Sequence, residues 1–316
     1  MQKFLRRLCR VSLGFMLTCV SCKTVLGIPE FEAGGNNVQE TAMNPGKDTD
    51  EPIALKYPVL LVHGAGFRDK TLGFINYWGR IPKYLARKGV AVYYGGTDAW
   101  GSIEGNAEKI KLAVLGVLVR EGVEKVNIIA HSRGGLEARY LISSLGMDGA
   151  VASLTTISTP HHGVKAMDMT VDTPDGLYKF TSFFVDIWFK MLGDKDPDFF
   201  TSSRQLSERR CLEFNKINPD MDTVYYQSYA AKMKFFFSDP TLMFLNPLIK
   251  ITDGDNDGLC PVDSAQWGDF KGVITTGGAF GISHAGIVDS YRINYKGVHI
   301  PELYVSIARD LSARGF

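Results

Sequence analysis

The sequence has almost no net charge: its 316 residues include 35 Lys and Arg against 34 Asp and Glu. A nucleic-acid-binding protein usually needs a basic surface, so this balance excludes nucleic acid as the main partner. The chain also lacks internal repeats and long low-complexity tracts, so it is not a repeat protein. The apolar fraction of 45% is enough for a large core, in one α/β domain or two smaller ones.

Long hydrophobic runs are missing as well. The longest near the N-terminus, Val11–Val20, is too short to span a bilayer and follows the cations Lys3, Arg6, Arg7 and Arg10. A cationic head before a short apolar run predicts an export signal, residues 1–22. Its end, LTCVSC, resembles a bacterial lipoprotein signal with Cys22 as the lipid-anchored first residue of a cell-envelope protein; Cys19 is the second choice, and plain secretion stays open.

Residues 23–56 contain no hydrophobic period and are rich in Gly, Asn, Glu and Asp, with Pro45 and Pro52. This composition predicts a disordered tether. Cysteine is scarce in the remaining chain, which keeps only Cys211 and Cys260. Export would permit a disulfide between them, and two unpaired core thiols are the alternative.

Residues 124–140, EKVNIIAHSRGGLEARY, contain the most informative motif. A short β-branched run, Val126–Ala130, predicts a buried strand, and helical spacing from Arg133 onward predicts a helix. Ser132 lies between them with small residues two positions before and after, Ala130 and Gly134. This arrangement is typical of a nucleophile elbow, in which a serine on a strained turn projects its hydroxyl beside a helix N-terminus.

Other segments alternate between strand and helix patterns. Strands are expected at 57–62, 90–94, 126–130, 151–158 and 272–276, and helices at 74–88, 103–121 and 301–313. Such alternation predicts a parallel sheet with helices on both faces. The His63-Gly64-Ala65 turn after the first strand suits an oxyanion hole, with the Ala65 N–H partnered by the Arg133 N–H. His63 is expected to hold this turn through hydrogen bonds.

Four segments resemble, in order and spacing, the bacterial true lipases of the Pseudomonas and Burkholderia type: YPVLLVHGAGF, NYWGRIPKYLARKGVAVY, KVNIIAHSRGG and VASLTTISTPHHG. The resemblance covers residues 57–163 and returns near Asp257. It implies an α/β-hydrolase fold for residues 57–316, carboxylic ester hydrolysis, and a triad in the chain order Ser, Asp, His. His161 and His162 are expected to be structural.

The resemblance assigns the catalytic acid to Asp257, in Asn-Asp-Gly, and the base to His284 rather than His299. The stretch 253–258 also fits the first half of a calcium loop, but Ser264 stands where an EF-hand needs a glutamate. The lipases carry a structural calcium ion, and here Gly286 replaces one of its aspartates. Asp239 resembles the other, and Asp289 is a substitute. The reaction needs no cofactor, whether calcium binds stays open, and so does a dependence on the family's dedicated folding chaperone.

Residues 164–252 depart most from the family and are predicted to form a lid or cap insertion. Six apolar residues between 180 and 191 recur at helical spacing, opposite Ser182, Asp186 and Lys190. They predict either a helix packed on the core or a lid that lines the substrate cleft. Phe67, Phe184 and Trp188 are the expected substrate contacts.

These patterns and the resemblance together predict an exported, membrane-tethered serine hydrolase that cleaves carboxylic esters of lipids, with the lipid ester and a lipid–water interface as its partners. Ser132, His284 and Asp257 would form its triad. The alternatives are an acyltransferase or thioesterase that uses the same triad, and a lipid-binding lipoprotein without activity.

Overall fold

The computed structural model describes residues 51–66, 69–71, 75–191 and 195–316, all within one compact unit, 38–316. The predicted export signal and Cys22 lie outside the described residues, as does most of the predicted tether. Its described end, 51–56, packs on the domain because Ile53 is buried and its N–H donates to Lys88 O over 2.8 Å. Within the described ranges, no helix is both long and apolar enough to cross a membrane.

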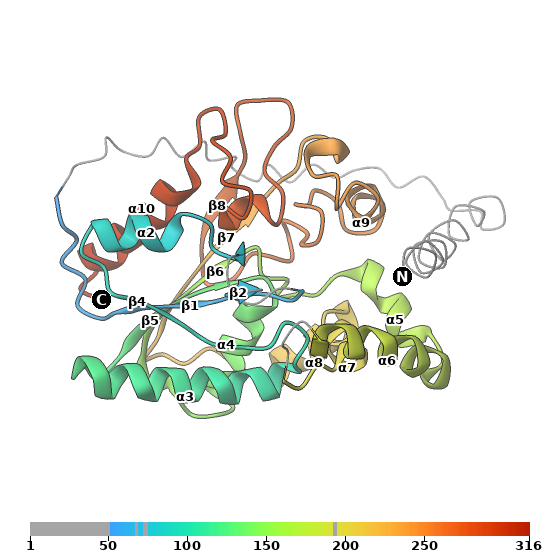
Figure 1. The fold of residues 1–316 in the computed structure, drawn as a ribbon, viewed down its shortest axis with the longest axis horizontal. Helices are drawn as coiled ribbons and strands as arrows, with labels where there is room; N and C mark the ends of the chain where they lie inside the picture. Colours follow the sequence, from blue (N-terminus) through green and yellow to red (C-terminus); the bar gives the residue numbers. More distant parts are fainter. Residues whose placement is uncertain (1–50, 67–68, 72–74, 192–194) are drawn as a thin grey trace. The chain divides into compact units, whose positions relative to one another are not determined.

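A six-stranded sheet forms the centre of the fold, in the order β4-β1-β5-β6-β7-β8 (Figure 1). All five strand pairs are parallel. The strands are β1 (Val59–Val62), β4 (Val92–Tyr94), β5 (Val126–His131), β6 (Val151–Ile157), β7 (Tyr225–Ala231) and β8 (Asp269–Ile274), and a separate hairpin joins β2 (Lys70–Thr71) and β3 (Ile75–Asn76).

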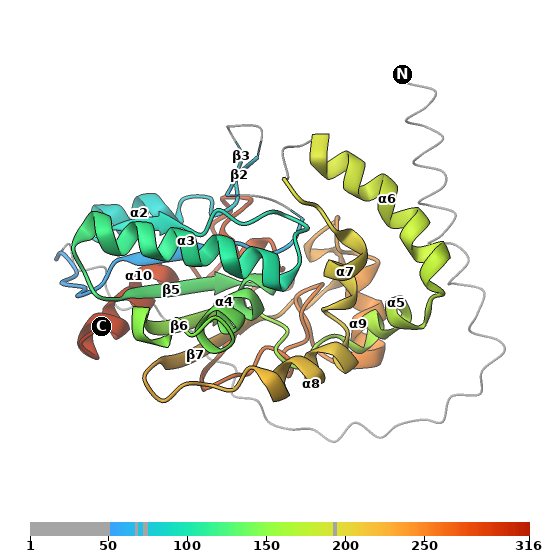
Figure 2. The ribbon, with the colours of Figure 1, turned by 90° about the horizontal axis from the view of Figure 1, so that it is seen from below.

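Helices cover both faces of the sheet, as the alternating pattern predicts. The elements are α2 (Ile81–Arg87), α3 (Ile103–Glu121), α4 (Arg133–Ser143), α5 (Asp168–Asp172), α6 (Asp175–Met191), α7 (Phe199–Arg204), α8 (Glu208–Ile217), α9 (Leu245–Asp253) and α10 (Ile300–Ala313), with short 3-10 turns at Asp148–Ala150, Lys165–Met167, Phe236–Ser238 and Gly286–Val288. Figures 1 and 2 show α5, α6 and α7 beyond the carboxyl ends of the strands.

Side-chain alternation along β1 divides the core into two layers. Val59 and Leu61 pack with α2 and α10, while Leu60 and Val62 pack with α3 and α4. Successive side chains of a strand point to opposite faces, so a strand covered on both faces must be apolar throughout. Two layers of helices therefore fix the sheet between them and leave its carboxyl edge for the loops.

Several boundaries differ from the sequence expectation. The helix predicted at 74–88 begins only at Ile81, because Pro82 suits the first turn of a helix and Tyr77 and Trp78 lie in a turn before it. Strand β7 was not predicted. It lies inside the expected insertion 164–252, so the cap elements are divided between the segments before and after this strand.

Three apolar residues of helix α6 are exposed to solvent. Phe183, Ile187 and Met191 are 57%, 44% and 76% exposed. On the other side Ser182 is buried, and the Asp186 carboxylate accepts the Phe199 N–H over 2.7 Å. The alternative of a helix packed on the core through its apolar face is therefore wrong for these three residues.

Cys211 and Cys260, for which a disulfide was one of two expectations, are both buried free thiols. Cys211 packs with Leu136 and Phe214 from α4 and α8, and Cys260 packs with Ala230 and Val273 of the sheet. Burial raises the pKa of Cys211 to about 12, which keeps it protonated at neutral pH. The structure therefore contains two unpaired core thiols, which was the alternative to a disulfide.

The buried histidines make the stability of the fold sensitive to acid. Burial lowers the pKa of His161 well below its ordinary value of 6.5, and the nearby Arg139 lowers it further. Below pH 6.5 the unfolded chain takes up a proton that the folded chain does not, so the unfolding free energy falls as the pH falls. We expect His161→Gln to make this fall shallower by about 1.4 kcal/mol per pH unit.

Urea denaturation between pH 7.5 and 5 measures this slope. The matched control is His162→Gln, because His162 is the next residue in the chain and is exposed. An equal slope for His161→Gln and the wild type would contradict the prediction.

Candidate active site

Ser132 occupies the strained turn that the elbow motif predicts. It follows β5 directly and has φ 57° and ψ −135°, a region that non-glycine residues rarely adopt. Its N–H donates to Ile157 O of the neighbouring strand over 2.9 Å, and its carbonyl accepts the Gly135 N–H over 3.0 Å. The sheet on one side and the first turn of α4 on the other thus fix the backbone of Ser132.

Glycines let two segments approach this turn closely. A Cβ on Gly134 would lie 2.5 Å from the carbonyl oxygen of His63, and a Cβ on Gly64 would lie 2.5 Å from the Cβ of Ser132. Both distances are shorter than any real carbon contact. The small residue predicted at 134 is thus explained by contact with the turn after β1.

The imidazole of His284 is held by a buried carboxylate. Its Nδ1 lies 2.8 Å from Asp257 Oδ2, and its backbone N–H donates to Asp257 O, also over 2.8 Å. The other carboxylate oxygen, Oδ1, accepts the N–H groups of Leu259 and Cys260 over 3.1 and 2.8 Å. His299, the competing histidine, packs instead on Tyr84 before α10, with ring centroids 5.3 Å apart.

His131, directly before Ser132, connects the elbow to His284. The two imidazole centroids are 4.4 Å apart. The hydroxyl of Tyr77 accepts the Gly64 N–H over 3.0 Å and lies 2.5 Å from His131 Nδ1, so its proton is free to bond that nitrogen. Burial first, and then the neighbouring imidazole of His284, lower the pKa of His131 well below 6.5 and keep it neutral.

A cavity of about 380 Å³ opens beside these groups. It is lined by Ala65, Tyr77, His131 and His284 together with mostly apolar residues from the loops that follow β7 and β8. The latter include Leu242, Leu259, Ala285, Val288 and Tyr291. The structure thus brings the predicted oxyanion turn and the predicted base to one cavity next to the elbow.

The turn after β1 is held as expected. His63 Nδ1 lies 2.8 Å from Gly64 O, and its Nε2 lies 2.9 Å from the hydroxyl of Thr97. Arg133 is the first residue of α4, so its N–H belongs to the first turn, where helix amides have no partner within the helix. The two predicted oxyanion amides, those of Ala65 and Arg133, therefore come from different segments that meet at the elbow.

Some predicted residues cannot be placed. Phe67 lies outside the described residues, and the structure describes only the backbone of Phe184 and Trp188, within α6. Tyr77 is the main residue that the sequence reasoning missed, because a helix was expected there. Leu259 and Ala285 were also missed, although each lies close to a predicted triad residue in sequence.

The two candidate calcium ligands, Asp239 and Asp289, both accept hydrogen bonds from protein groups. Asp289 is bonded by Arg80, with Nη2 to Oδ1 at 2.7 Å and Nε to Oδ2 at 2.9 Å. Asp239 accepts the hydroxyls of Thr241 and Tyr291 over 2.7 and 2.9 Å. Across the part of the chain that the structure describes, no group of three or more His, Cys, Asp or Glu could hold a metal. These contacts do not test the calcium ion that the resemblance implies, and it stays a prediction.

Comparison with known proteins adds family information to this geometry. The chain is 31% identical over 198 residues to a triacylglycerol lipase of Burkholderia plantarii, which covers 59% of this chain and 55% of that protein. It is 28% identical over 264 residues to triacylglycerol lipase 2 of Saccharomyces cerevisiae, with coverages of 77% and 75%. The chain spans just over half the length of two bacterial relatives, those of Burkholderia plantarii and Pseudarthrobacter phenanthrenivorans.

Solved structures share the fold. A metagenomic carboxyl esterase superposes with a TM-score of 0.65 at 17% identity, over 84% of this chain and 78% of that one. The Staphylococcus hyicus lipase gives 0.56 at 19% identity, over 87% and 98%. The model of one protein family, palmitoyl protein thioesterase, matches residues 58–273, well over half of the chain. The chain has the α/β-hydrolase fold and belongs to the palmitoyl protein thioesterase family.

Proposed function

We propose that this protein hydrolyses carboxylic esters of lipids through a Ser132, His284 and Asp257 triad. The observation that carries the proposal is the His284–Asp257 pair, 2.8 Å apart, whose imidazole packs against the residue directly before a serine at positive φ. A nucleophile, a base and a group that orients the base are the three parts that such catalysis needs.

In this mechanism the hydroxyl of Ser132 attacks the ester carbonyl while His284 Nε2 takes its proton. Asp257 holds His284 Nδ1–H and stabilises the imidazolium that forms. The backbone amides of Ala65 and Arg133 bind the oxyanion, and each such donor contributes about 3 kcal/mol. His284 then protonates the leaving alcohol, and a water molecule activated by the same imidazole releases the fatty acid.

A lipid substrate is supported by the cavity and by the relatives. The cavity is lined mainly by apolar side chains beside His284, as an acyl chain requires. Relatives in bacteria and yeast are named triacylglycerol lipases. The exposed residues Phe183, Ile187 and Met191 of α6 would meet a lipid surface, and we assign α6, with Phe184 and Trp188, to a lid.

We also propose that the protein is exported, with Cys22 as a lipid anchor or, alternatively, as a secreted form. The support is the cationic and apolar pattern of residues 1–22. No cofactor enters the mechanism. The dedicated folding chaperone of the related lipases remains a candidate partner.

The first test replaces the nucleophile. We expect Ser132→Ala to lower kcat on p-nitrophenyl esters on the order of 10⁶-fold, because the attacking atom is removed. Wild type and variant are compared on short and long acyl chains, with a fluorophosphonate probe to label the serine. Equal turnover by the variant would remove the mechanism, and an unlabelled, inactive wild type would favour the lipid-binding alternative.

The same assay includes a palmitoyl thioester and a competing alcohol, because the matched family is named for a thioesterase. We expect the oxygen ester to have the higher kcat/KM and water to be the main acceptor. A preference for the thioester would indicate a thioesterase, and transfer to the alcohol would indicate an acyltransferase. Either result would contradict the proposed ester hydrolysis while keeping the triad.

A second test displaces the nucleophile without deleting it. Gly64→Ala puts a methyl group 2.5 Å from the Cβ and 3.0 Å from the Oγ of Ser132, too close for either to stay in place, so we expect at least about a 100-fold loss of kcat. The control is Gly116→Ala on α3, where the new methyl group meets nothing within 4 Å. This control should retain activity and gain about 0.5–1 kcal/mol of stability, measured by urea denaturation. Full activity of Gly64→Ala would show that the turn does not confine Ser132.

A further inference from the structure

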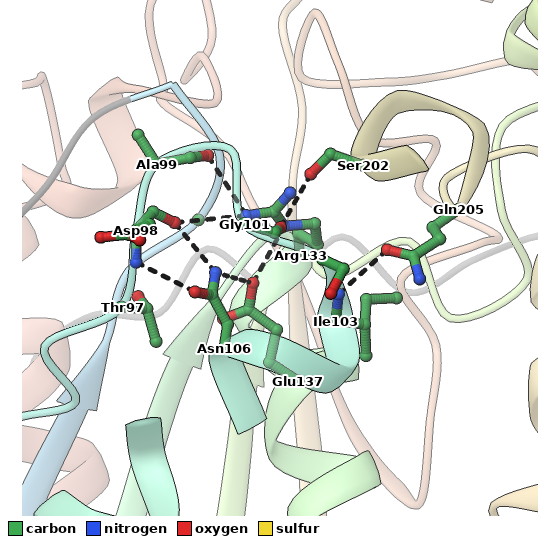
Figure 3. Close-up of polar contacts among 12 residues, drawn as sticks. Thr97, Asp98, Ala99, Gly101, Ile103, Asn106, Arg133, Glu137, Ser202 and Gln205 are labelled. Atoms are coloured by element: carbon green, nitrogen blue, oxygen red, sulfur yellow. Dashed lines mark hydrogen bonds and ion pairs between the residues drawn. The ribbon is translucent and has the colours of Figure 1, made fainter. Parts of the chain in front are cut away.

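The residue after the nucleophile carries a buried charge that the mechanism does not use. Arg133 and Glu137 are both completely buried on the first turns of α4, and Arg133 Nε donates to Glu137 Oε1 over 2.9 Å. Figure 3 shows this pair facing the loop 97–101, which follows β4. The backbone amide of Arg133 is the proposed oxyanion donor, so its side chain is fixed at the same residue.

The guanidinium of Arg133 contacts the loop 97–101, which supports the turn after β1 that carries the other proposed oxyanion donor. Arg133 Nη2 donates to Ala99 O over 3.2 Å and to Asp98 O over 3.4 Å. The same carbonyl of Ala99 accepts the N–H of Gly66 over 3.1 Å, and Gly66 directly follows Ala65. One carbonyl oxygen therefore joins the turn after β1 to the first residue of α4.

Asn106 of α3 holds the same loop from the other side. Its amide nitrogen donates to Asp98 O over 2.9 Å and to Glu137 Oε1 over 2.8 Å, and its amide oxygen accepts the Asp98 N–H over 3.0 Å. The loop is thus bonded to α3 and to α4 (Figure 3). Through Ala99 O it is also bonded to the turn after β1.

Stability alone is a weak explanation for this arrangement. Taking both charges out of water costs about as much as their attraction returns, and apolar replacements of similar volume are often neutral or stabilising. Burial indeed raises the pKa of Glu137 in spite of the adjacent Arg133. The planar guanidinium of Arg133, held by Glu137, supplies hydrogen-bond donors that point in fixed directions. An apolar side chain has no such donors.

We propose that the Arg133 guanidinium, oriented by Glu137 and Asn106, is a positioning group that sets the oxyanion turn against α4 through the carbonyl of Ala99. The proposal rests on the function proposed above. It concerns the side chain of Arg133 alone, since replacement by Met or Lys keeps the backbone N–H. Misplacement of the turn by a fraction of an ångström would weaken transition-state binding more than substrate binding.

The decisive variant is the double replacement Arg133→Met with Glu137→Met, which removes the pair without leaving an unpaired buried charge. We expect it to keep the urea midpoint of the wild type, while kcat on a p-nitrophenyl ester falls about 10- to 100-fold and KM changes little. A second variant, Arg133→Lys, keeps the charge but cannot bond Glu137 and Ala99 O with one planar fork, so we expect an intermediate loss of kcat.

The matched control is Arg139→Met. Arg139 is another buried arginine of α4, but it bonds Asn215 and Asn218 instead of the oxyanion turn. We expect Arg139→Met to lower the urea midpoint and to leave kcat per folded molecule unchanged. This result would separate loss of stability from loss of positioning.

The outcomes distinguish the two proposals. If the wild type is active through Ser132 and both the double variant and Arg133→Lys match its kcat within about twofold, the positioning role is overturned while the hydrolase survives. A fall of kcat in Arg139→Met equal to that in the double variant would also overturn it. A wild type without Ser132-dependent turnover would overturn the hydrolase and, with it, this role.

Discussion

The positive φ of Ser132 is the constraint on which the rest of the site depends. A serine held at φ 57° costs on the order of 1–3 kcal/mol, so the surrounding structure must fix it. It does so with the strongest elements available: β5 lies in the middle of the sheet, between β1 and β6, and α4 begins at the next residue. Gly64 and Gly134 also contribute, because they have no side chain and a side chain at either position would overlap the turn.

The parallel sheet explains how distant residues meet. Strands β1 and β5 are neighbours and end at the same edge, so the His63–Gly66 turn and Ser132 are adjacent although about 70 positions separate them. The loop after β8 returns to this edge and brings His284 against His131. A hydrogen bond from the His284 backbone N–H to Asp257 O joins the two loops. The side chains of the same two residues form a second contact, between His284 Nδ1 and Asp257 Oδ2.

Local patterns predicted the elements that carry strong periodicity. Helix α3 has the predicted bounds, because Ser102 caps its first turn and Gly122 ends it in a left-handed conformation. Strand β7 could not be found in this way, because its polar residues are buried and satisfied across the sheet. Gln227 donates to Thr155 Oγ1 over 2.8 Å, and Ser228 donates to Trp267 O over 2.7 Å. Tyr77 was missed for a similar reason: its role comes from contacts with Gly64 and His131, which no local pattern contains.

The orientation of α6 is the other feature that a hydrophobic pattern cannot predict. A large apolar side chain that is fully exposed forgoes about 1.5–3 kcal/mol of burial. Phe183, Ile187 and Met191 are partly exposed and forgo part of it, while the Asp186 carboxylate accepts the N–H of Phe199 at the start of α7. The chain after α6 is also attached to the loop 97–101, because the Asp196 N–H donates to Asp98 Oδ2 over 3.0 Å and the Asp198 N–H to Trp100 O over 2.7 Å. The loop that contacts Arg133 and Gly66 therefore also contacts the segment joining α6 to α7. A movement of α6, the proposed lid, would thus act on the same loop that supports the turn after β1, where we propose one oxyanion donor.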